Sequence, residues 1–521
     1  MRIVFLFVFA VLAMATGFAQ DQRSTDLEDV EIKIIEEREI TLPPATRRFE
    51  KVPPRPAETS RPTFSYEFEP FAFQAAQINP AIRPLKLKQE NPSDIFGGYL
   101  SAGYGNYSSP YLEGFVNSRR DRNKLIGAHA FHRSSGKGPV DEKNSASGTS
   151  GISVFGKAFS DFISLSAEAG FENRFTHFYG YPPGTGKDAE DIRQAYNLFS
   201  LKGELSNTRS TDFTWQLGAG LSYLSDHYDA RESEADFDFN SAYELNDESA
   251  IAIKADYSLI SRKDSLVELT PRSLFSVNPR YEFSPVEGLK LSAGFVAAFE
   301  NDSLSKDVHA YPDLRASYPL TPSVDVTASL SGGIEKVSLH SLSNENMWLA
   351  ANIPVFHTNK LLDLQAALHT KIGNKVAVNG GFSLASLKHL YFFRNLDADP
   401  SRFTVEYDDV TSRTNFFASL AFAQTETFKF MIRGDVYGYS TDIEEAWHRP
   451  TYKVTGETSL NVSDKFLLDV KLISQGGMKA FDPVADTQVK LDPAFDLNVR
   501  TEYLFSGTVS IFGEFNNITS S

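Results

Sequence analysis

Residues 163–175 read ISLSAEAGFENRF, and apolar and polar side chains alternate along them. Apolar residues occupy the odd positions except Asn173, and polar residues or glycine occupy the even ones. Successive side chains of a β-strand point to opposite faces, so this segment has one apolar and one polar face. The same alternation recurs in three further stretches, residues 289–299, 362–369 and 495–503. From residue 97 onward no helical stretch is expected, and the sequence predicts an all-β chain.

The links between the alternating segments are short and long in turn. The short links are residues 117–123, 160–161, 207–212, 284–288, 320–324, 373–375, 425–427, 463–465 and 506–508. The long links are residues 134–148, 180–191, 225–236, 261–270, 338–360, 395–402, 440–450 and 478–491, and the first outer link, 106–109, is short. A soluble β-sandwich also alternates, but short periplasmic turns and long outer loops are typical of bacterial outer-membrane barrels. The pattern therefore predicts a large antiparallel transmembrane β-barrel.

The segments number about 21, whereas single-chain bacterial barrels have even strand counts. The last strand, near residues 509–515, would run outward and leave the end of the chain outside the cell. We therefore expect a barrel over residues 96–521 that lacks the last of 22 strands.

The first 95 residues differ in composition and pattern from the predicted barrel. Arg2, an apolar run at residues 3–15 and the small residues around Ala19 predict a signal peptide over residues 1–19. The apolar run is shorter than the roughly 20 residues that a membrane anchor needs. Residues 20–95 are rich in proline and charge, which predicts a mostly irregular periplasmic extension with one short strand near 30–35. The chain is thus expected in the cell outer membrane.

Composition excludes several classes of function. The mean hydropathy of -0.28 is too polar for a bundle of membrane helices. The 42 phenylalanines and 21 tyrosines suit the aromatic girdles of a barrel. A net charge of -16 opposes binding to nucleic acid, and the absence of cysteine excludes disulfides and thiolate sites. The expected partners are outer-membrane lipid and lipopolysaccharide.

Several short motifs lie near the C-terminus and in one long link. Residues 495–499 read FDLNV, 502–503 read EY, 515–518 read FNNI, and 341–351 read SLSNENMWLAA. These motifs resemble the barrel of TonB-dependent receptors of the Bacteroidetes type, over about residues 97–518. The resemblance implies transport through a 22-stranded barrel, and such transporters carry a plugged lumen.

The chain departs from that family ahead of the barrel. Residues 20–95 are too few, and lack the glycine-rich strand pattern, for the family's plug domain. A stretch that resembles a TonB box, the segment through which such receptors engage an energiser, occurs at Asp29, Val30, Glu31 and Ile32. Any short acidic and apolar stretch would match it equally well. The implied partners are a TonB-type energiser, or a separate plug or periplasmic protein.

Six charged residues lie at the polar positions of predicted strands and are expected to face the lumen: Glu168, Glu172, Arg174, Asp496, Arg500 and Glu502. They could set ion selectivity or bind a substrate, or simply hydrate and cross-link a polar interior. The acidic stretches 226–238 and 188–191 could hold divalent cations, but their irregular spacing favours solvated outer loops. No metal site is expected.

No catalytic motif was found, because the chain has no HExxH, G-x-S-x-G or GxxxxGK[ST] pattern. Neither enzymatic activity nor a cofactor is expected. Two hypotheses remain open. The first is a plugless, receptor-like barrel that binds or passes a solute. The second is a structural or docking component of an outer-membrane assembly or secretion complex. The proline-rich residues 42–62 suit either hypothesis, since an extended chain can thread the lumen or bind a partner.

Overall fold

A computed structural model of the chain describes residues 97–118, 121, 123–181, 186–208, 212–266, 270–302, 307–425 and 427–519. The expected signal peptide, the extension over residues 20–95 and the TonB-box-like residues 29–32 lie outside the described residues. Within the described part of the chain, no helix is long and apolar enough to cross a membrane.

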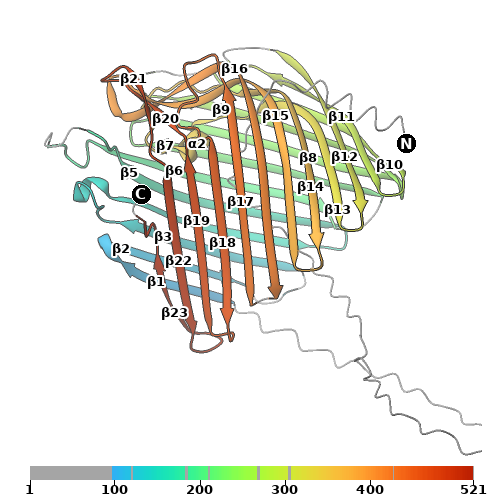
Figure 1. Ribbon diagram of the computed structural model, residues 1–521, viewed down its shortest axis with the longest axis horizontal. Helices are drawn as coiled ribbons and strands as arrows, with labels where there is room; N and C mark the ends of the chain where they lie inside the picture. Colours follow the sequence, from blue (N-terminus) through green and yellow to red (C-terminus); the bar gives the residue numbers. More distant parts are fainter. Residues whose placement is uncertain are drawn as a thin grey trace, which may run out of the picture. The chain divides into compact units, whose positions relative to one another are not determined.

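One antiparallel sheet of 21 strands dominates the structure, as expected (Figure 1). Its first eleven strands are β1 (Gly98–Gly105), β2 (Ser109–Asn117), β3 (Lys124–Ser135), β4 (Ser147–Phe159), β5 (Ile163–His177), β6 (Arg193–Asn207), β7 (Phe213–Asp226), β8 (Arg231–Asn246), β9 (Ser249–Lys263), β10 (Arg272–Val286) and β11 (Leu289–Glu300). The others are β12 (Val308–Thr321), β13 (Val324–Glu335), β14 (Thr358–Ile372), β15 (Val376–Leu396), β16 (Asp399–Thr425), β17 (Phe428–Ser440), β18 (Tyr452–Val462), β19 (Phe466–Gly476), β22 (Ala494–Leu504) and β23 (Ser510–Phe515). A separate hairpin, β20 (Lys479–Asp482) and β21 (Thr487–Lys490), interrupts the sequence order.

Each strand of the large sheet pairs with its neighbours along the chain, and β19 pairs with β22 across the small hairpin. Figure 1 shows the sheet curling around an interior. All these pairings are antiparallel and the strand number is odd, so β1 and β23 run in the same direction. Among the described residues these two strands have no backbone pairing with each other.

The links confirm the expected asymmetry between the two ends of the barrel. At one end, here the short-turn end, the strands are joined by tight connections such as 160–162, 373–375 and 463–465. At the other, the long-loop end, the links reach from 178 to 192 and from 336 to 357.

The structure contradicts the predicted bounds of two outer loops. The expected link 225–236 is mostly strand, because β8 already begins at Arg231. Along this segment, acidic residues on one face of β8 alternate with small or apolar residues on the other face. The expected link 395–402 is a two-residue turn, since β15 and β16 stay paired from Val376 to Asn395. Two further links, 247–248 and 301–307, were not expected.

The expectation of no helix is also wrong. A helix, α2 (Leu339–Glu345), lies in the link between β13 and β14. Ser338 caps it, because its side chain accepts a hydrogen bond from the backbone N–H of Ser341, and the Ser341 hydroxyl in turn accepts from the N–H of Ser338. The two other helical segments described are short 3₁₀ turns, η1 (Asn106–Ser108) and η2 (Glu142–Ser145).

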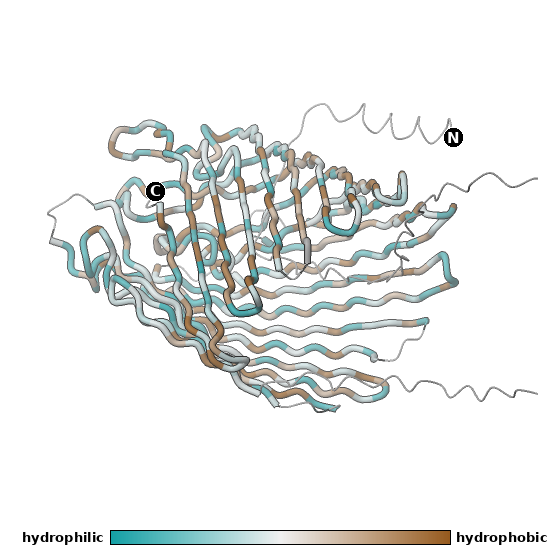
Figure 2. Tube along the Cα trace, turned by 60° about the horizontal axis from the view of Figure 1, so that its bottom comes forward, coloured by the Kyte–Doolittle hydropathy of each residue, from teal (hydrophilic) through white to brown (hydrophobic). Residues whose placement is uncertain are grey.

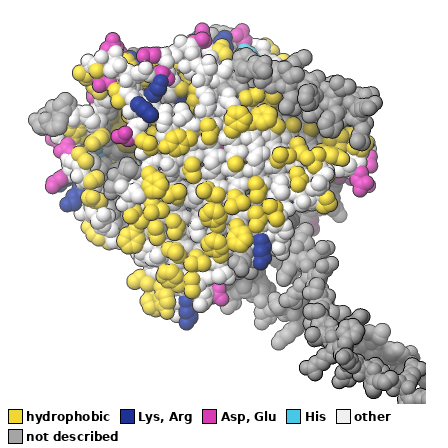
Figure 3. Space-filling model, viewed as in Figure 1, with side chains coloured by type: hydrophobic (Ala, Val, Ile, Leu, Met, Phe, Trp, Pro, Cys, Tyr) yellow, Lys and Arg dark blue, Asp and Glu magenta, His cyan; other side chains and the backbone are white. Residues whose placement is uncertain are grey.

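Apolar side chains cover the outer face of the wall. Figure 2 shows hydrophilic and hydrophobic residues alternating along the strands, and Figure 3 shows hydrophobic side chains spread over the middle of one face. On β6 and β7, Leu201 and Leu221 are paired in register and are 51% and 53% exposed. Such a continuous exposed apolar band is the surface that a lipid bilayer would cover.

We expect Leu201→Arg to lower the free energy of unfolding by about 2–4 kcal/mol, because a charge on the lipid face loses its hydration. Urea titration of the protein in phospholipid vesicles measures this change. The matched control is Ser200→Arg, which places the same charge on the opposite face of β6 and should cost much less. Equal losses for both variants would contradict this orientation of the wall.

Candidate functional site

The link between β13 and β14, residues 336–357, lies across the interior of the barrel and is called the inner loop here. Its Trp348 donates its indole N–H to the backbone oxygen of His177, at the end of β5, over 2.9 Å. Its Leu349 forms an isolated bridge with Phe403 of β16. Because β5 and β16 are far apart in the strand order, the segment that reaches both must cross the space that the sheet encloses.

Three arginines of the wall hold backbone oxygens of the inner loop. Arg174 of β5 donates to the oxygen of Ser343 at 3.2 Å and to its hydroxyl at 3.3 Å. Arg262 of β9 donates to the oxygen of Ile353 at 2.9 Å, and Arg272 of β10 donates to that of Val337 at 3.0 Å. All three guanidinium groups belong to buried residues, and charge-assisted hydrogen bonds of this kind are stronger than neutral ones.

Carboxylates of β8 and of the links that follow β9 and β11 accept the loop's backbone N–H groups. Glu232 of β8, which is 1% exposed, accepts from Leu339 at 2.9 Å and from His340 at 2.8 Å. Asp302 accepts from His357 at 2.6 Å, and Asp264 accepts from Asn352 at 3.1 Å. Since buried amide groups need partners, these carboxylates fix the path of the loop's backbone. The wall thus recognises the main chain of the loop as well as its side chains.

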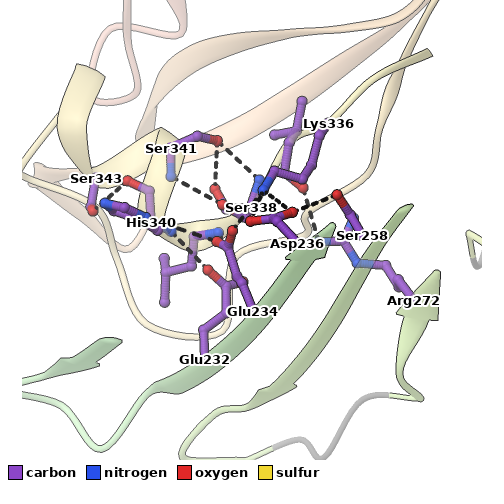
Figure 4. Close-up of polar contacts among 12 residues, drawn as sticks. Glu232, Glu234, Asp236, Ser258, Arg272, Lys336, Ser338, His340, Ser341 and Ser343 are labelled. Carbon is purple, nitrogen blue, oxygen red and sulfur yellow. Dashed lines mark hydrogen bonds and ion pairs between the residues drawn. The ribbon is translucent and has the colours of Figure 1, made fainter. Parts of the chain in front are cut away.

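One lysine joins the start of the loop to a row of carboxylates on β8 (Figure 4). The Lys336 ammonium lies 2.9 Å from Glu234 and 2.7 Å from Asp236. Ser258 of β9 donates a further hydrogen bond to Asp236. The imidazole of His340 also faces this row, at 4.0 Å from Glu234. Loss of the lysine would leave Glu234, whose side chain is 5% exposed, as an uncompensated buried charge.

Apolar contacts also fix the inner loop in place. Leu339, Leu342 and Leu349 are at most 3% exposed. They belong to one core with residues of β6, β7, β15 and β16, whose buried members are Tyr196, Leu224, Ala230, Val337, Leu339, Leu342, Leu349, Ala350, Ile353, Val355, Tyr391, Phe393 and Val405. Burying a leucine side chain contributes roughly 1.5–3 kcal/mol. The loop is therefore a packed constriction of the lumen.

The strand register places all six charged candidates on the face of the sheet that carries the inner loop. Arg174 contacts the loop, and Glu172 pairs with Arg174 at 3.1 Å. Glu168 lies opposite Lys202 of β6 in the ladder. On β22, Arg500 lies 3.2 Å from Glu502, and Asp496 accepts from Asn498 at 2.9 Å. The six candidates therefore form two groups, one on β5 and one on β22. Their role in ion selectivity stays a prediction.

Sequence reasoning missed the residues that hold the loop. Glu232 and Arg262 fall inside stretches that the sequence predicts to be outer loops, 225–236 and 261–270. A usable signal was present, since Glu232, Glu234 and Asp236 recur at every second position. The described residues contain no group of three or more side chains suited to a metal ion. The acidic residues of β8 instead bind the loop's lysine and amides, whereas residues 188–191 do lie in the link between β5 and β6.

Comparisons with solved structures found barrels of the same fold. The iron transporter FrpB from Neisseria meningitidis, in its F3-3 variant, matches with a TM-score of 0.63 and 7% identity, over 82% of this chain and 77% of that one. The siderophore receptor PirA from Acinetobacter baumannii matches with a TM-score of 0.62 and 9% identity, over 81% and 75%. A mutant of the ferric enterobactin receptor PfeA from Pseudomonas aeruginosa matches with a TM-score of 0.59 and 10% identity, over 81% and 74%.

No protein-family model and no curated protein matches the sequence. At such low identities the structural likeness shows the fold. The fold implied by the resemblance to TonB-dependent receptors is therefore confirmed. The three proteins compared above are named as transporters or receptors, and none is named as an enzyme.

We expect Glu232→Ala to loosen the inner loop, because it leaves two buried backbone N–H groups without acceptors. A loss of about 2 kcal/mol would speed hydrogen exchange at the amides of Leu339 and His340 roughly 30-fold. Hydrogen exchange read by mass spectrometry measures this change. Asp238→Ala is the control, since Asp238 lies on the same face of β8 and contacts Asn240. Unchanged exchange in the Glu232 variant would contradict its role.

Protonation of His357 should weaken the packing of the inner loop. Burial and the charge of Arg272 lower the pKa of His357 to about 4, although Asp302 opposes the shift. Its neutral ring accepts a hydrogen bond from the N–H of Val337 at 3.1 Å. A released loop would protonate this ring near pH 6.5, so the contribution of His357 alone disfavours the packed loop by about 3 kcal/mol as the pH falls from above 6.5 to 4.

The mobility of a spin label attached through Asn344→Cys, on the exposed side of α2, follows this release, since the chain has no other cysteine. His357→Asn keeps an acceptor for Val337 but does not titrate in this range. Between pH 6.5 and 4 the mobility should therefore rise by more in the wild type than in His357→Asn. An equal response in both would contradict the role of His357.

Proposed function

We propose that this chain is an outer-membrane transport barrel whose lumen is narrowed by the inner loop. The observation that carries the proposal is the loop itself, packed across the interior and bound by charged groups of many strands. A wall that only anchors a structure in the membrane has no need of such a constriction, whereas a pore uses one to choose what passes. The shared fold with proteins named as iron transporters and siderophore receptors supports the same proposal.

In this proposal the long-loop end faces the outside of the cell and the short-turn end faces the periplasm. The signal peptide, residues 1–19, exports the chain, and residues 20–95 extend into the periplasm. A TonB-type energiser or a separate periplasmic protein would meet this extension, and lipid with lipopolysaccharide would surround the apolar band. The inner loop would then take over part of the obstruction that a plug domain provides in 22-stranded transporters.

The test is single-channel conductance of the full chain in planar lipid bilayers. Replacement of residues 338–356 by a short Gly-Ser linker removes the constriction and should raise the conductance several-fold, since the pore widens. A second variant that lacks residues 20–95 tests whether the extension also obstructs the lumen. Circular dichroism and resistance to unfolding in detergent control for an intact barrel.

If neither the wild type nor either variant conducts, although their barrels are folded, transport would be contradicted. This outcome would favour the alternative, a structural or docking component of an outer-membrane complex. That alternative instead expects stable complexes between residues 20–95 and periplasmic proteins.

A further inference from the structure

The upper part of the β15–β16 hairpin extends beyond the pairing of the barrel wall. β15 pairs with β14 only as far as Lys388, and β16 pairs with β17 only from Ser412 onward. Among the described residues, 389–409 form ladder pairs only with one another, apart from the bridge between Phe403 and Leu349 of the inner loop. Residues 389–409 are called the free hairpin below. Contacts outside the ladders of the wall therefore fix its position.

Both faces of the free hairpin are buried. Alternate residues of a strand face opposite sides, and the two sets here pack in different cores. Tyr391 and Phe393 belong to the core that contains the inner loop. Leu390 and Phe392 pack against Trp447 of the β17–β18 link and against the β20–β21 hairpin. The free hairpin is thus a middle layer, with the inner loop on one face and two outer segments on the other.

The tip of the free hairpin contacts the opposite side of the barrel. The Arg402 guanidinium lies 4.2 Å from the ring centroid of Phe178 and 4.7 Å from that of Tyr228. It also donates a hydrogen bond to the Tyr228 hydroxyl at 3.3 Å. Phe178 follows β5 and Tyr228 follows β7, far from β15 and β16 in the strand order. The free hairpin therefore reaches across the long-loop end, and Arg402 with the two rings is called the latch.

The base of the free hairpin has the features of a hinge. Its ladder skips the pair His389 and Asp409, and His389 has a left-handed φ of 57°. Such a φ is uncommon for a residue other than glycine, and hinges consist of a few positions that absorb a backbone change. Next to this break, Asp408 is 0% exposed and accepts from the N–H groups of Asp442 and Ile443 at 2.8 and 2.9 Å. The base is therefore anchored, and the break lies beside the anchor.

The latch is a weaker attachment than the contacts that hold the inner loop. Glu232 is 1% exposed and the Arg262 side chain 3%, so parting either from the loop would leave a buried charge uncompensated. The Arg402 side chain is 21% exposed, and its charge regains water when the tip moves. Tyr391 and Phe393 pack on the core of the inner loop and need no counter-charge when they leave it. The free hairpin should therefore part from the inner loop before the loop parts from the wall.

We propose that the free hairpin is an outer lid over the inner loop, that it swings about the His389–Asp409 pair, and that Arg402 latches its tip to the opposite rim. This inference rests on the proposed transport function, in which the long-loop end faces the outside of the cell. A closed lid separates the inner loop from solutes outside, so the lid opens before a solute passes. Loss of the latch shifts the balance of lid positions toward the open one.

Distances between two spin labels test the latch, because the chain contains no cysteine of its own. Ala398→Cys, exposed at the tip, and Tyr179→Cys, 58% exposed beside Phe178, place labels on the two sides of the latch. In double electron–electron resonance, Arg402→Ala should raise the population of longer distances roughly tenfold.

Arg394→Ala is the matched control for the latch. It removes the same charge from the free hairpin, but the Arg394 guanidinium lies 3.7 Å from the ring centroid of Phe481 in β20 and not at the rim. This variant should leave the distances unchanged. Equal populations of longer distances in the two variants, or no change in Arg402→Ala, would rule out the latch.

A disulfide tests the lid itself. Leu349 and Phe403 are bridge partners, and neighbouring strands lie about 4.8 Å apart, within the reach of a disulfide. Leu349→Cys with Phe403→Cys therefore joins the lid to the inner loop. Oxidation of this variant should lower its mean single-channel current at least roughly fivefold, and reduction should restore it. The reduced form controls for the two substitutions, and titration of free thiols confirms that the bond has formed.

A second disulfide controls for cross-linking of these strands. Leu384→Cys with Thr414→Cys joins positions that face each other on β15 and β16 below the hinge, where both strands pair with the wall. Its oxidation should leave the current unchanged. An equal loss of current in this variant would contradict a lid that moves only above the hinge.

The outcomes separate the lid from the function. Current that persists with the disulfide between positions 349 and 403 formed would overturn the lid and leave transport in place. Folded barrels without current, oxidised or reduced, would contradict transport, and the label distances would still decide whether Arg402 latches the hairpin.

Discussion

A lipid bilayer offers no water to the backbone, so each N–H and C=O group within it must find a partner in the protein. Among the described residues, the sheet satisfies this demand through antiparallel ladders from β1 to β23, except along the facing edges of these two strands, which are not paired with each other. The same ladders fix which residues face outward, because a shift of register by one residue would turn a whole strand over. The apolar outer band and the charged inner face of the barrel are two consequences of this single pairing rule.

The backbone of the inner loop also needs hydrogen-bond partners, but it lies inside the barrel and not in the bilayer. It crosses the enclosed space without a neighbouring strand along most of its length, so side chains of the wall take the place of a ladder. Arg174, Arg262 and Arg272 donate to its oxygens, and Glu232 accepts from its amides. These wall groups come from β5, β8, β9 and β10, and the apolar core adds β6, β7, β15 and β16. The loop is therefore stable only within the complete barrel.

This arrangement divides the interior into two regions with different chemistry. Under the loop, charges are buried and matched to fixed partners, so they stabilise the constriction. Along β22 and β23, the side chains of Arg500, Glu502 and Glu514 pair with one another and stay 23–28% exposed. The candidates Arg174 and Arg500, equivalent by their strand position in the sequence, belong to different regions.

The sequence by itself determined the fold class, the approximate number of strands and the two kinds of link, because alternation and turn residues act over a few neighbouring positions. It also placed Glu172, Arg174, Arg500 and Glu502 on the polar face of their strands. Only the tertiary structure decided that residues 336–357 enter the lumen, and that Glu232 and Arg262 hold them. Those contacts join residues about 90 to more than 100 positions apart. Local periodicity carries no information about such pairs, since they form only when closure of the sheet brings distant strands to face one enclosed space.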